Sequence, residues 1–254
     1  MSAHSASTDG ASAINYSRYL QLDELLSLQT LQSEPPHPDE LLFIVIHQAS
    51  ELWFKCLRHE FDTLITALEA FDTMRALLAV QRINVLTGIV AHELSALDTL
   101  PPQRFAQFRG YLGSSSGSQS AQFRAIEAMA GLRDPHFLAA ISDHGAPPAI
   151  VQEALARPTL QSLVLALLAH EAVSLDDLYL GPAPTPLFLL VEGLLEFEQA
   201  FARWRFLHVQ LVERIIGPMT GGTGGTLGAK YLSKTVSHKF FPELWAVRAR
   251  LYGR

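Results

Sequence analysis

The chain has 254 residues, of which 48% are hydrophobic and only 17% are charged, and its formal net charge is −6. This length suits one large domain, and the composition excludes an intrinsically disordered protein. No run or stripe of Lys and Arg stands out, so we expect no nucleic-acid partner. Mean hydropathy is positive, at +0.17. We therefore expect an apolar ligand pocket or a subunit interface to cover the surplus apolar surface.

The single cysteine, Cys56, excludes an intramolecular disulfide and a cysteine-rich zinc or iron–sulfur site. We expect this thiol to be buried, and one buried thiol fits a reducing compartment, so we expect a cytoplasmic protein. The longest apolar runs, 41–46 and 163–169, fall short of the ~20 residues of a membrane-spanning helix, so no membrane association is expected. Residues 1–13 are rich in Ser and Ala, and we interpret them as a disordered tail before a single domain over residues 14–254.

Helical patterns separated by Pro- and Gly-rich breaks follow one another along the chain. They are expected at 16–29, 41–71, 74–100, 104–112, 119–132, 150–178 (two helices around Pro158), 186–217 and 242–252. Asp39 precedes the first long pattern and is expected to cap its N-terminus. No stretch shows sustained period-two alternation between hairpin turns. The sequence therefore predicts an all-α fold, a helical bundle with two long central helices.

One apolar stripe of the second long helix carries a histidine in its middle. The stripe consists of Phe201, Trp204, His208, Leu211 and Ile215, spaced i, i+3, i+7, i+10 and i+14. A core histidine that is hydrogen-bonded to a neighbouring carbonyl is the commoner reason for such a position. The alternative is an axial ligand to haem iron, since helical proteins hold haem with an imidazole in an apolar groove between helices.

The first long helix has a similar histidine. Phe43 and His47 lie one turn apart in an otherwise apolar stretch. Here too a satisfied core histidine is the commoner interpretation, and a ligand-binding residue is the alternative. If a metal is present, two histidines on apolar helix faces without cysteine partners favour a porphyrin over zinc.

Two further features have a functional and a plain interpretation. Arg109 precedes a Ser-rich loop, and its guanidinium is suited to clamp a substrate carboxylate, although most arginines are simply surface residues. The glycine-rich segment 221–228 matches no phosphate-binding motif, because a helix rather than a strand precedes it. A flexible lid whose Thr223 hydroxyl contacts a ligand is better supported, and a linker is the alternative.

Several blocks of this sequence resemble the tryptophan 2,3-dioxygenase family. They occur in the family's order and span nearly the whole chain: YSRYLQLDELL (16–26), LLFIVIHQASELWFK (41–55), FRGYLGSSSGSQSAQFRAIE (108–127), WRFLH (204–208), GTGG (222–225) and FFPELWAVR (240–248). The second and third blocks are highly specific. The resemblance implies an all-helical haem oxygenase, usually a homotetramer built as a dimer of dimers, with haem b as its cofactor.

The resemblance also implies roles for single residues around the haem. His208 would be the proximal ligand to the iron, with Trp204 against the haem. Ser116 would complete the pocket around the haem and the substrate. His47 would lie in the distal pocket near the indole nitrogen of L-tryptophan, and Phe43 would pack on the indole ring.

Other implied residues bind the amino-acid part of the substrate or come from a second subunit. Arg109 would bind the substrate carboxylate, and Thr223 would lie near its ammonium group. Tyr16, Tyr19 and Leu20 match a segment that, in the family, completes the active site of the neighbouring subunit.

The implied reaction inserts both atoms of dioxygen at the C2–C3 bond of indole and gives N-formylkynurenine. Two positions depart from the family, because Phe105 stands where many members have tyrosine and Ser118 replaces a phenylalanine. Since both positions fall around the active site, one alternative is a haem-dependent monooxygenase that turns tryptophan or a substituted tryptophan into an oxindole, using a reductant or a peroxide. A haem-binding protein without turnover is the non-enzymatic alternative.

Overall fold

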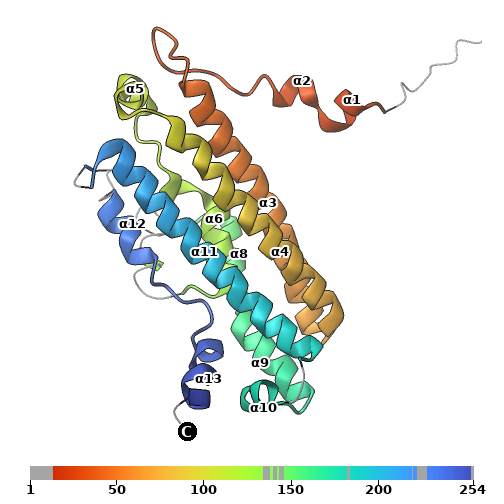
Figure 1. Cartoon of the computed structure of the whole chain (residues 1–254). Helices are drawn as coiled ribbons and strands as arrows, with labels where there is room; N and C mark the ends of the chain where they lie inside the picture. The colour runs from red at the N-terminus through yellow and green to blue at the C-terminus, as the bar shows by residue number, and fades with distance from the viewer. Residues whose placement is uncertain are drawn as a thin grey trace, which may run out of the picture.

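The computed structural model of the chain describes residues 14–133, 138–139, 142, 146–181, 184–218, 220–221 and 228–252. Within these ranges the regular elements are helices and none is a strand (Figure 1). The predicted all-α class is therefore confirmed. The predicted tail, residues 1–13, and the predicted ligand residue Thr223 lie outside the described residues.

The helices follow the chain in a simple order. They are α1 (Tyr16–Leu20), α2 (Leu22–Leu25), α3 (Glu40–Glu69), α4 (Thr73–Glu93), α5 (Pro102–Phe108), α6 (Ala121–Ala130), α8 (Ala149–Ala156), α9 (Leu160–His170), α10 (Leu175–Leu180), α11 (Pro186–Ile216), α12 (Ala229–Thr235) and α13 (Pro242–Tyr252). Short 3-10 helices continue or connect them: η1 (Leu94–Thr99), η2 (Arg109–Leu112) and η3 (Gly117–Gln119). The two long helices predicted from the sequence are α3 and α11.

The structure corrects several predicted elements. The single pattern at 16–29 is two short helices, because Gln21 adopts a left-handed conformation between them, with φ of 51°. The stretch 150–178 holds α8, α9 and the start of α10 rather than two helices, since Ala172 makes a similar left-handed break, with φ of 54°. The helix expected to reach residue 100 ends at Glu93 and continues as η1. Helix α12 was not predicted. The Cys56 thiol, which is expected to be buried, is exposed on the surface of α3.

The predicted cap of the first long helix is also wrong in detail. Asp39 stands at the N-cap of α3, but its side chain accepts no capping hydrogen bond. Its carboxylate instead pairs with the Arg104 guanidinium on α5. The Asp39 carboxylate therefore forms a tertiary ion pair instead of capping the helix.

Helices α3, α4 and α11 form the body of the molecule, with α4 packed along both of the others (Figure 1). Gly193 allows α11 to approach α4 closely, because a Cβ at this position would lie 2.6 Å from Cγ1 of Val80. At one end of the body the side chains of α3 and α11 meet in the core, where the rings of Phe61 and Phe197 pack edge to face at 5.3 Å. At the other end they surround a cavity.

Residues 73–99 are long and apolar enough to cross a membrane, judged by length and composition alone. A core helix in a bundle passes the same test. The inward side of α4, which includes Ala76, Val80 and Ile83, is buried against α3 and α11. This packing agrees with a core helix, and the absence of membrane association stays a prediction.

A buried carboxylate attaches the C-terminal helix to the body. Glu198 on α11 is 1% exposed and accepts hydrogen bonds from the backbone N–H groups of Phe240 and Phe241 at 2.6 and 2.8 Å, just before α13 begins. The Trp245 indole N–H on α13 donates to the same carboxylate, and the Lys239 ammonium lies 3.3 Å from it. Glu198 therefore serves as an N-terminal cap that comes from another helix.

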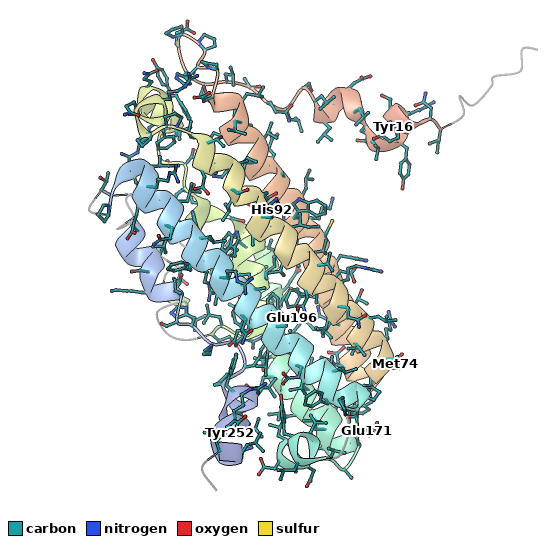
Figure 2. The ribbon with its side chains drawn as sticks, viewed as in Figure 1. Tyr16, Met74, His92, Glu171, Glu196 and Tyr252 are labelled. Atoms are coloured by element: carbon teal, nitrogen blue, oxygen red, sulfur yellow. The ribbon has the colours of Figure 1, made fainter. Side chains whose placement is uncertain are left out.

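Residues 14–27, which we call the arm, extend away from the body (Figures 1 and 2). No residue of α1 or α2 is buried. The side chains of Tyr16 and Tyr19 are about three-quarters exposed, at 76% and 74%, and Leu26 is similarly exposed. The arm is therefore an apolar surface that a single chain leaves exposed to solvent.

Candidate functional site

A cavity of about 700 Å³ lies between α3, α11 and the connection from α5 to α6. This volume falls within the roughly 300–1,000 Å³ of small-molecule and cofactor sites. The wall includes residues that the sequence singled out at distant positions in the chain, namely Phe43, His47, Arg109, Ser116, Trp204 and His208. The structure therefore brings most of the predicted site residues together in one place.

His208 is held on the cavity face of α11, with the Trp204 ring 5.6 Å away between centroids. Burial lowers the pKa of His208 to about 4, and the nearby His47 adds to this effect. The imidazole is therefore neutral at physiological pH and can offer a nitrogen lone pair to a metal. The described residues contain no group of three or more His, Cys, Asp or Glu side chains that could hold a metal ion. A porphyrin iron can be held by a single protein imidazole.

Two buried donors in the cavity wall have no acceptor among the described residues, the indole N–H of Trp204 and the Nε of Arg205. The rest of the Arg205 guanidinium is fixed, since it donates to the Glu127 carboxylate at 2.6 Å and to the Thr235 carbonyl at 3.0 Å. Leaving a buried donor without an acceptor is costly. These orphaned groups fit a ligand that carries carboxylates, as haem does, so the residues present fit a haem.

His47 presents its ring to the same cavity. Its Nδ1 donates to the Phe43 carbonyl at 2.7 Å, which leaves Nε2 as an acceptor when the ring is neutral. Burial lowers the pKa of His47, although the Phe43 carbonyl and the Glu51 carboxylate oppose the shift. Both interpretations from the sequence are thus partly met, because one nitrogen is satisfied by a backbone carbonyl and the other remains available to a ligand.

Aromatic rings form an apolar part of the wall beside His47. The Phe43 ring lies 4.2 Å from the His47 ring, 5.5 Å from Phe105 and 5.8 Å from Phe108. Phe105 is 7% exposed and belongs to α5, which packs against the end of α11. Offset and tilted rings at these separations suit a flat aromatic ligand such as an indole.

Arg109 follows α5 and reaches the cavity from the side. One of its terminal nitrogens donates to the Gly221 carbonyl at 2.6 Å, at the start of the glycine-rich segment. No carboxylate among the described residues forms an ion pair with this guanidinium. Its charge is therefore available to an acidic ligand.

The Ser-rich loop adds hydroxyl groups to the wall. The hydroxyls of Ser116 and Ser118 are 2.9 Å apart, and Ser116 and Gln119 form a reciprocal capping box around η3. The following helix, α6, is fastened to α3 by Gln122, whose amide donates to the backbone carbonyl and the carboxylate of Glu51 at 2.8 and 2.9 Å. These hydrogen bonds order the Ser-rich loop and attach the helix that follows it to the helix that carries His47.

Sequence reasoning missed the charged groups of the cavity wall. Glu127 and Arg205 form a buried ion pair there, and Glu40 is fully buried at its edge. In the sequence these residues look like ordinary charges on helices. The position of Arg205 inside the apolar WRFLH block is the one signal that pointed to burial.

Some predicted site residues do not reach this cavity. Tyr16, Tyr19 and Leu20 lie on the arm, apart from the cavity of their own chain, and Tyr16 is labelled there in Figure 2. Their predicted place in a neighbouring subunit stays a prediction. Thr223 and the proposed lid around it lie outside the described residues.

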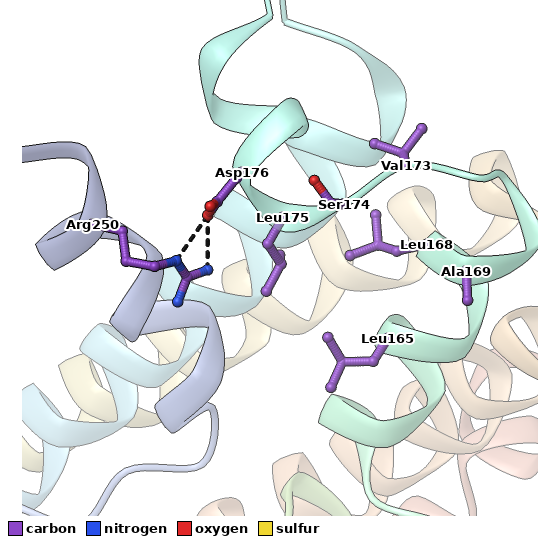
Figure 3. A pocket seen from close by; sticks show the side chains of 8 residues that line it. All are labelled: Leu165, Leu168, Ala169, Val173, Ser174, Leu175, Asp176 and Arg250. Atoms are coloured by element: carbon purple, nitrogen blue, oxygen red, sulfur yellow. Dashed lines mark hydrogen bonds and ion pairs between the residues drawn. The ribbon is translucent and has the colours of Figure 1, made fainter. Parts of the chain in front are cut away.

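A second hollow, of about 420 Å³, lies between α9, α10 and α13 (Figure 3). Leucines such as Leu165 and Leu175 line it, and Arg250 at its rim pairs with Asp176 at 2.8 Å. None of the predicted site residues is there, and the charge of Arg250 is already neutralised. The cavity around His208 is therefore the candidate site.

Comparisons of the sequence with known proteins point to one family. The sequence model of a family described as tryptophan 2,3-dioxygenase matches residues 1–142 and 173–251. A protein of that name from Herpetosiphon aurantiacus is 40% identical over 94% of this chain and 99% of its own length. Others from Anaeromyxobacter sp. and Caulobacter vibrioides are 38% and 37% identical, over 98% and 95% of this chain and 98% and 100% of their own lengths. The chain therefore belongs to the tryptophan 2,3-dioxygenase family.

Proposed function

We propose that this protein is a haem-dependent oxygenase that converts L-tryptophan and dioxygen into N-formylkynurenine. The observation that carries the proposal is the meeting of three groups in one cavity: the neutral imidazole of His208, the acceptor nitrogen of His47 and the free charge of Arg109. The names of the relatives support dioxygenation over the oxindole-forming alternative.

Haem b is the form of the cofactor that we propose. Covalent attachment of a c-type haem uses a Cys-x-x-Cys-His motif, whereas the one cysteine here, Cys56, does not line the cavity. When bound, haem supplies the activation of dioxygen. His208 would hold the iron from α11. The orphaned N–H groups of Trp204 and Arg205 would donate hydrogen bonds to the carboxylates of the haem.

The chain itself binds and orients the substrate. Phe43 and Phe105 pack on the indole ring and exclude water from it. Nε2 of His47 accepts the indole N–H, because Nδ1 is already committed to the Phe43 carbonyl. The Arg109 guanidinium exchanges its Gly221 carbonyl for the substrate carboxylate, which is a stronger, charge-assisted acceptor.

The proposal extends to assembly and location. A homotetramer, as a dimer of dimers, would bury the apolar arm, and Tyr16, Tyr19 and Leu20 would complete the cavity of a neighbouring subunit. The low charge content and the exposed apolar side chains support this assembly. A cytoplasmic location fits the single free thiol, Cys56.

The reaction is tested by incubating the haem-loaded, reduced enzyme with L-tryptophan and ¹⁸O₂. We expect N-formylkynurenine that carries two labelled oxygen atoms. A singly labelled oxindole, formed only with added reductant or peroxide, would overturn the proposal.

The contribution of the arm is tested by mixing two chains, each of which is expected to turn over L-tryptophan poorly by itself. One carries Arg109→Leu and keeps its arm, and the other lacks residues 1–27 and keeps Arg109. Mixed oligomers should recover activity, because the arm of the first chain completes the intact cavity of the second. If the co-expressed chains form mixed oligomers that are no more active than either chain alone, the arm does not act across the interface.

A further inference from the structure

The arm is joined to α3 by residues 28–39, which we call the strap. Glu40, the first residue of α3, has a fully buried side chain that faces the strap. One carboxylate oxygen accepts the N–H of Gln32 at 2.7 Å, and the other accepts the N–H and the hydroxyl of Ser33 at 3.0 and 2.5 Å. The Ser33 hydroxyl accepts the N–H of His37 at 2.8 Å. A single carboxylate thus organises the middle of the strap.

A second residue of α3 holds the beginning of the strap. The Gln48 amide donates to the Leu28 carbonyl at 3.1 Å, and it accepts a hydrogen bond from the Gln29 amide at 2.6 Å. Glu40 and Gln48 lie on either side of Phe43 and His47 along the helix, and both also line the cavity. The helix that presents His47 to the substrate is therefore the helix that holds the strap.

The strap in turn contacts the helix that precedes Arg109. Nε2 of His37 lies 3.0 Å from the Gln107 amide oxygen, and the His37 ring packs at a tilt of 38° against Phe108, with 5.2 Å between the centroids. Farther along, the Tyr111 hydroxyl donates to the Glu34 carbonyl at 2.6 Å. These contacts flank Arg109 on both sides in the sequence, so the position of its backbone depends on the strap.

We propose that Glu40 is a positioning residue for substrate binding, because its carboxylate fixes the strap that sets the place of Arg109 and the origin of the arm relative to His47. The inference rests on the proposed function and deepens it. It assigns a role to a buried carboxylate that touches neither the haem ligand nor the substrate-binding guanidinium.

The ionised state of Glu40 is consistent with this role. Burial raises the pKa of its carboxyl, but the hydrogen bonds from Ser33 and Gln32, aided by His37, outweigh burial and hold the pKa below its ordinary value. An ionised carboxylate accepts three donors at once, whereas a neutral amide of the same shape must turn an N–H group toward one of them.

Glu40→Gln tests the inference with almost no change in volume. We expect amide hydrogen exchange in residues 28–38 to accelerate roughly tenfold and KM for L-tryptophan to rise roughly fivefold, as for the loss of one buried hydrogen bond. The haem spectrum should stay as in the wild type, and kcat should change by less than about twofold, because the Glu40 carboxylate lies apart from the iron ligand. Ser33→Ala, which removes one hydrogen bond and no charge, should shift exchange and KM in the same direction by less.

Glu60→Gln is the matched control, since Glu60 is a nearly buried glutamate of the same helix that pairs with Arg82 rather than with the strap. It should leave exchange in the strap and KM as in the wild type. If Glu40→Gln showed the amide exchange and the KM of the wild type, the inference would be overturned. An equal rise in KM in Glu60→Gln would overturn it too. Failure of the proposed function is distinguishable, because it would show as the absence of N-formylkynurenine from the wild-type enzyme.

Discussion

The two ends of the helical body differ, although the same helices build both. Toward one end, α3 and α11 bury large apolar side chains such as Phe61, Leu64 and Phe197. Toward the other end, they present His47, Trp204 and His208 to a cavity. Stability and ligand binding are thus separated along the length of two helices rather than between two domains.

This separation has a physical cause. A close-packed core holds few voids and few unpaired polar groups, whereas the cavity end needs polar groups whose partners arrive with a ligand. The orphaned N–H of Trp204 lies at the cavity end. At the core end, the buried Glu198 is satisfied by the protein itself. Substitutions at the core end should therefore lower stability, whereas substitutions at the cavity end should impair ligand binding.

The largest effect on function is expected from His208→Ala. The variant should lose stoichiometric haem binding while its far-ultraviolet circular dichroism stays helical, because the imidazole is the proposed axial ligand and not a core residue. Titration with haem and the Soret band give the measurement. His59→Ala removes an exposed histidine of α3 and should bind haem normally. An unchanged spectrum in His208→Ala would refute the ligand assignment.

The largest effect on stability is expected from Phe61→Ala at the core end. Removal of this fully buried ring should lower the free energy of unfolding by about 3–5 kcal/mol, measured by urea denaturation at fixed haem occupancy. Thr66→Ala, at an exposed position of the same helix, should stay within about 0.5 kcal/mol of the wild type. If Phe61→Ala instead altered the haem spectrum without loss of stability, the separation of the two ends would be wrong.

Arg109→Leu should act at the cavity end alone. Loss of a charge-assisted pair with the substrate carboxylate costs roughly 2–5 kcal/mol, so kcat/KM for L-tryptophan should fall by at least about 30-fold, with haem content unchanged. L-tryptophanol, which lacks the carboxylate, is the matched substrate. Wild type and variant should turn it over similarly, and an equal loss with both substrates would remove the carboxylate role.

His47→Ser should keep haem and reduce turnover of L-tryptophan by about tenfold, as for one lost hydrogen bond to the substrate. The structure motivates this expectation, because Nδ1 is committed to the Phe43 carbonyl and Nε2 is left for the indole N–H. 1-Methyltryptophan offers no N–H, so the variant should lose less with that substrate. Equal losses would argue against a hydrogen bond to the indole nitrogen.

The smallest expected effect is a pH dependence away from the cavity. Burial, together with the Glu192 carboxylate that accepts its hydrogen bond, raises the pKa of Tyr179 to about 12, against the opposing charge of Arg248. A raised pKa favours the neutral phenol in the folded protein, so this stabilisation is intact below about pH 10 and is lost toward pH 12. Because Tyr179 is only half-buried, we expect about 1 kcal/mol.

Thermal unfolding of the wild type and Tyr179→Phe between pH 8 and pH 11.5 measures this contribution of Tyr179 to stability. The wild type should be the more stable protein at pH 8, and the difference should narrow as the pH rises. A difference that is constant over the range would exclude the titration of Tyr179 as its cause.

Much of the fold could be predicted because the long helices carry unbroken apolar periodicity and begin at clear signals. Pro186 and Pro242 each occupy the first position of a helix that was predicted to start there. The break at Ala172 could not be predicted, because an alanine in a left-handed conformation leaves no Gly or Pro signal. Helix α12 was missed because it is short and depends on tertiary contacts, such as that of Arg205 with the Thr235 carbonyl.

Residues of the site could be predicted where a polar side chain interrupts an apolar stripe of a helix. His47 and His208 stand out as polar residues on apolar stripes, and the structure places both at the cavity. Glu40 and Glu127 do not stand out, because a glutamate on a helix is most often exposed and only the tertiary structure shows that these two are buried. The polar support of the site is therefore hidden from a single sequence.

The cap that Glu198 supplies to α13 has a consequence for how this family can diversify. Arg205 holds the end of α12 and Glu198 holds the start of α13, so the chain that leaves α11 at Gly217 is tied back to the same helix twice. Both ties follow Gly228, which lines the cavity. A change of chain length between Gly217 and Gly228 therefore leaves the attachment of α12 and α13 to α11 intact. The scaffold can therefore stay the same while the length of the chain between α11 and α12 varies.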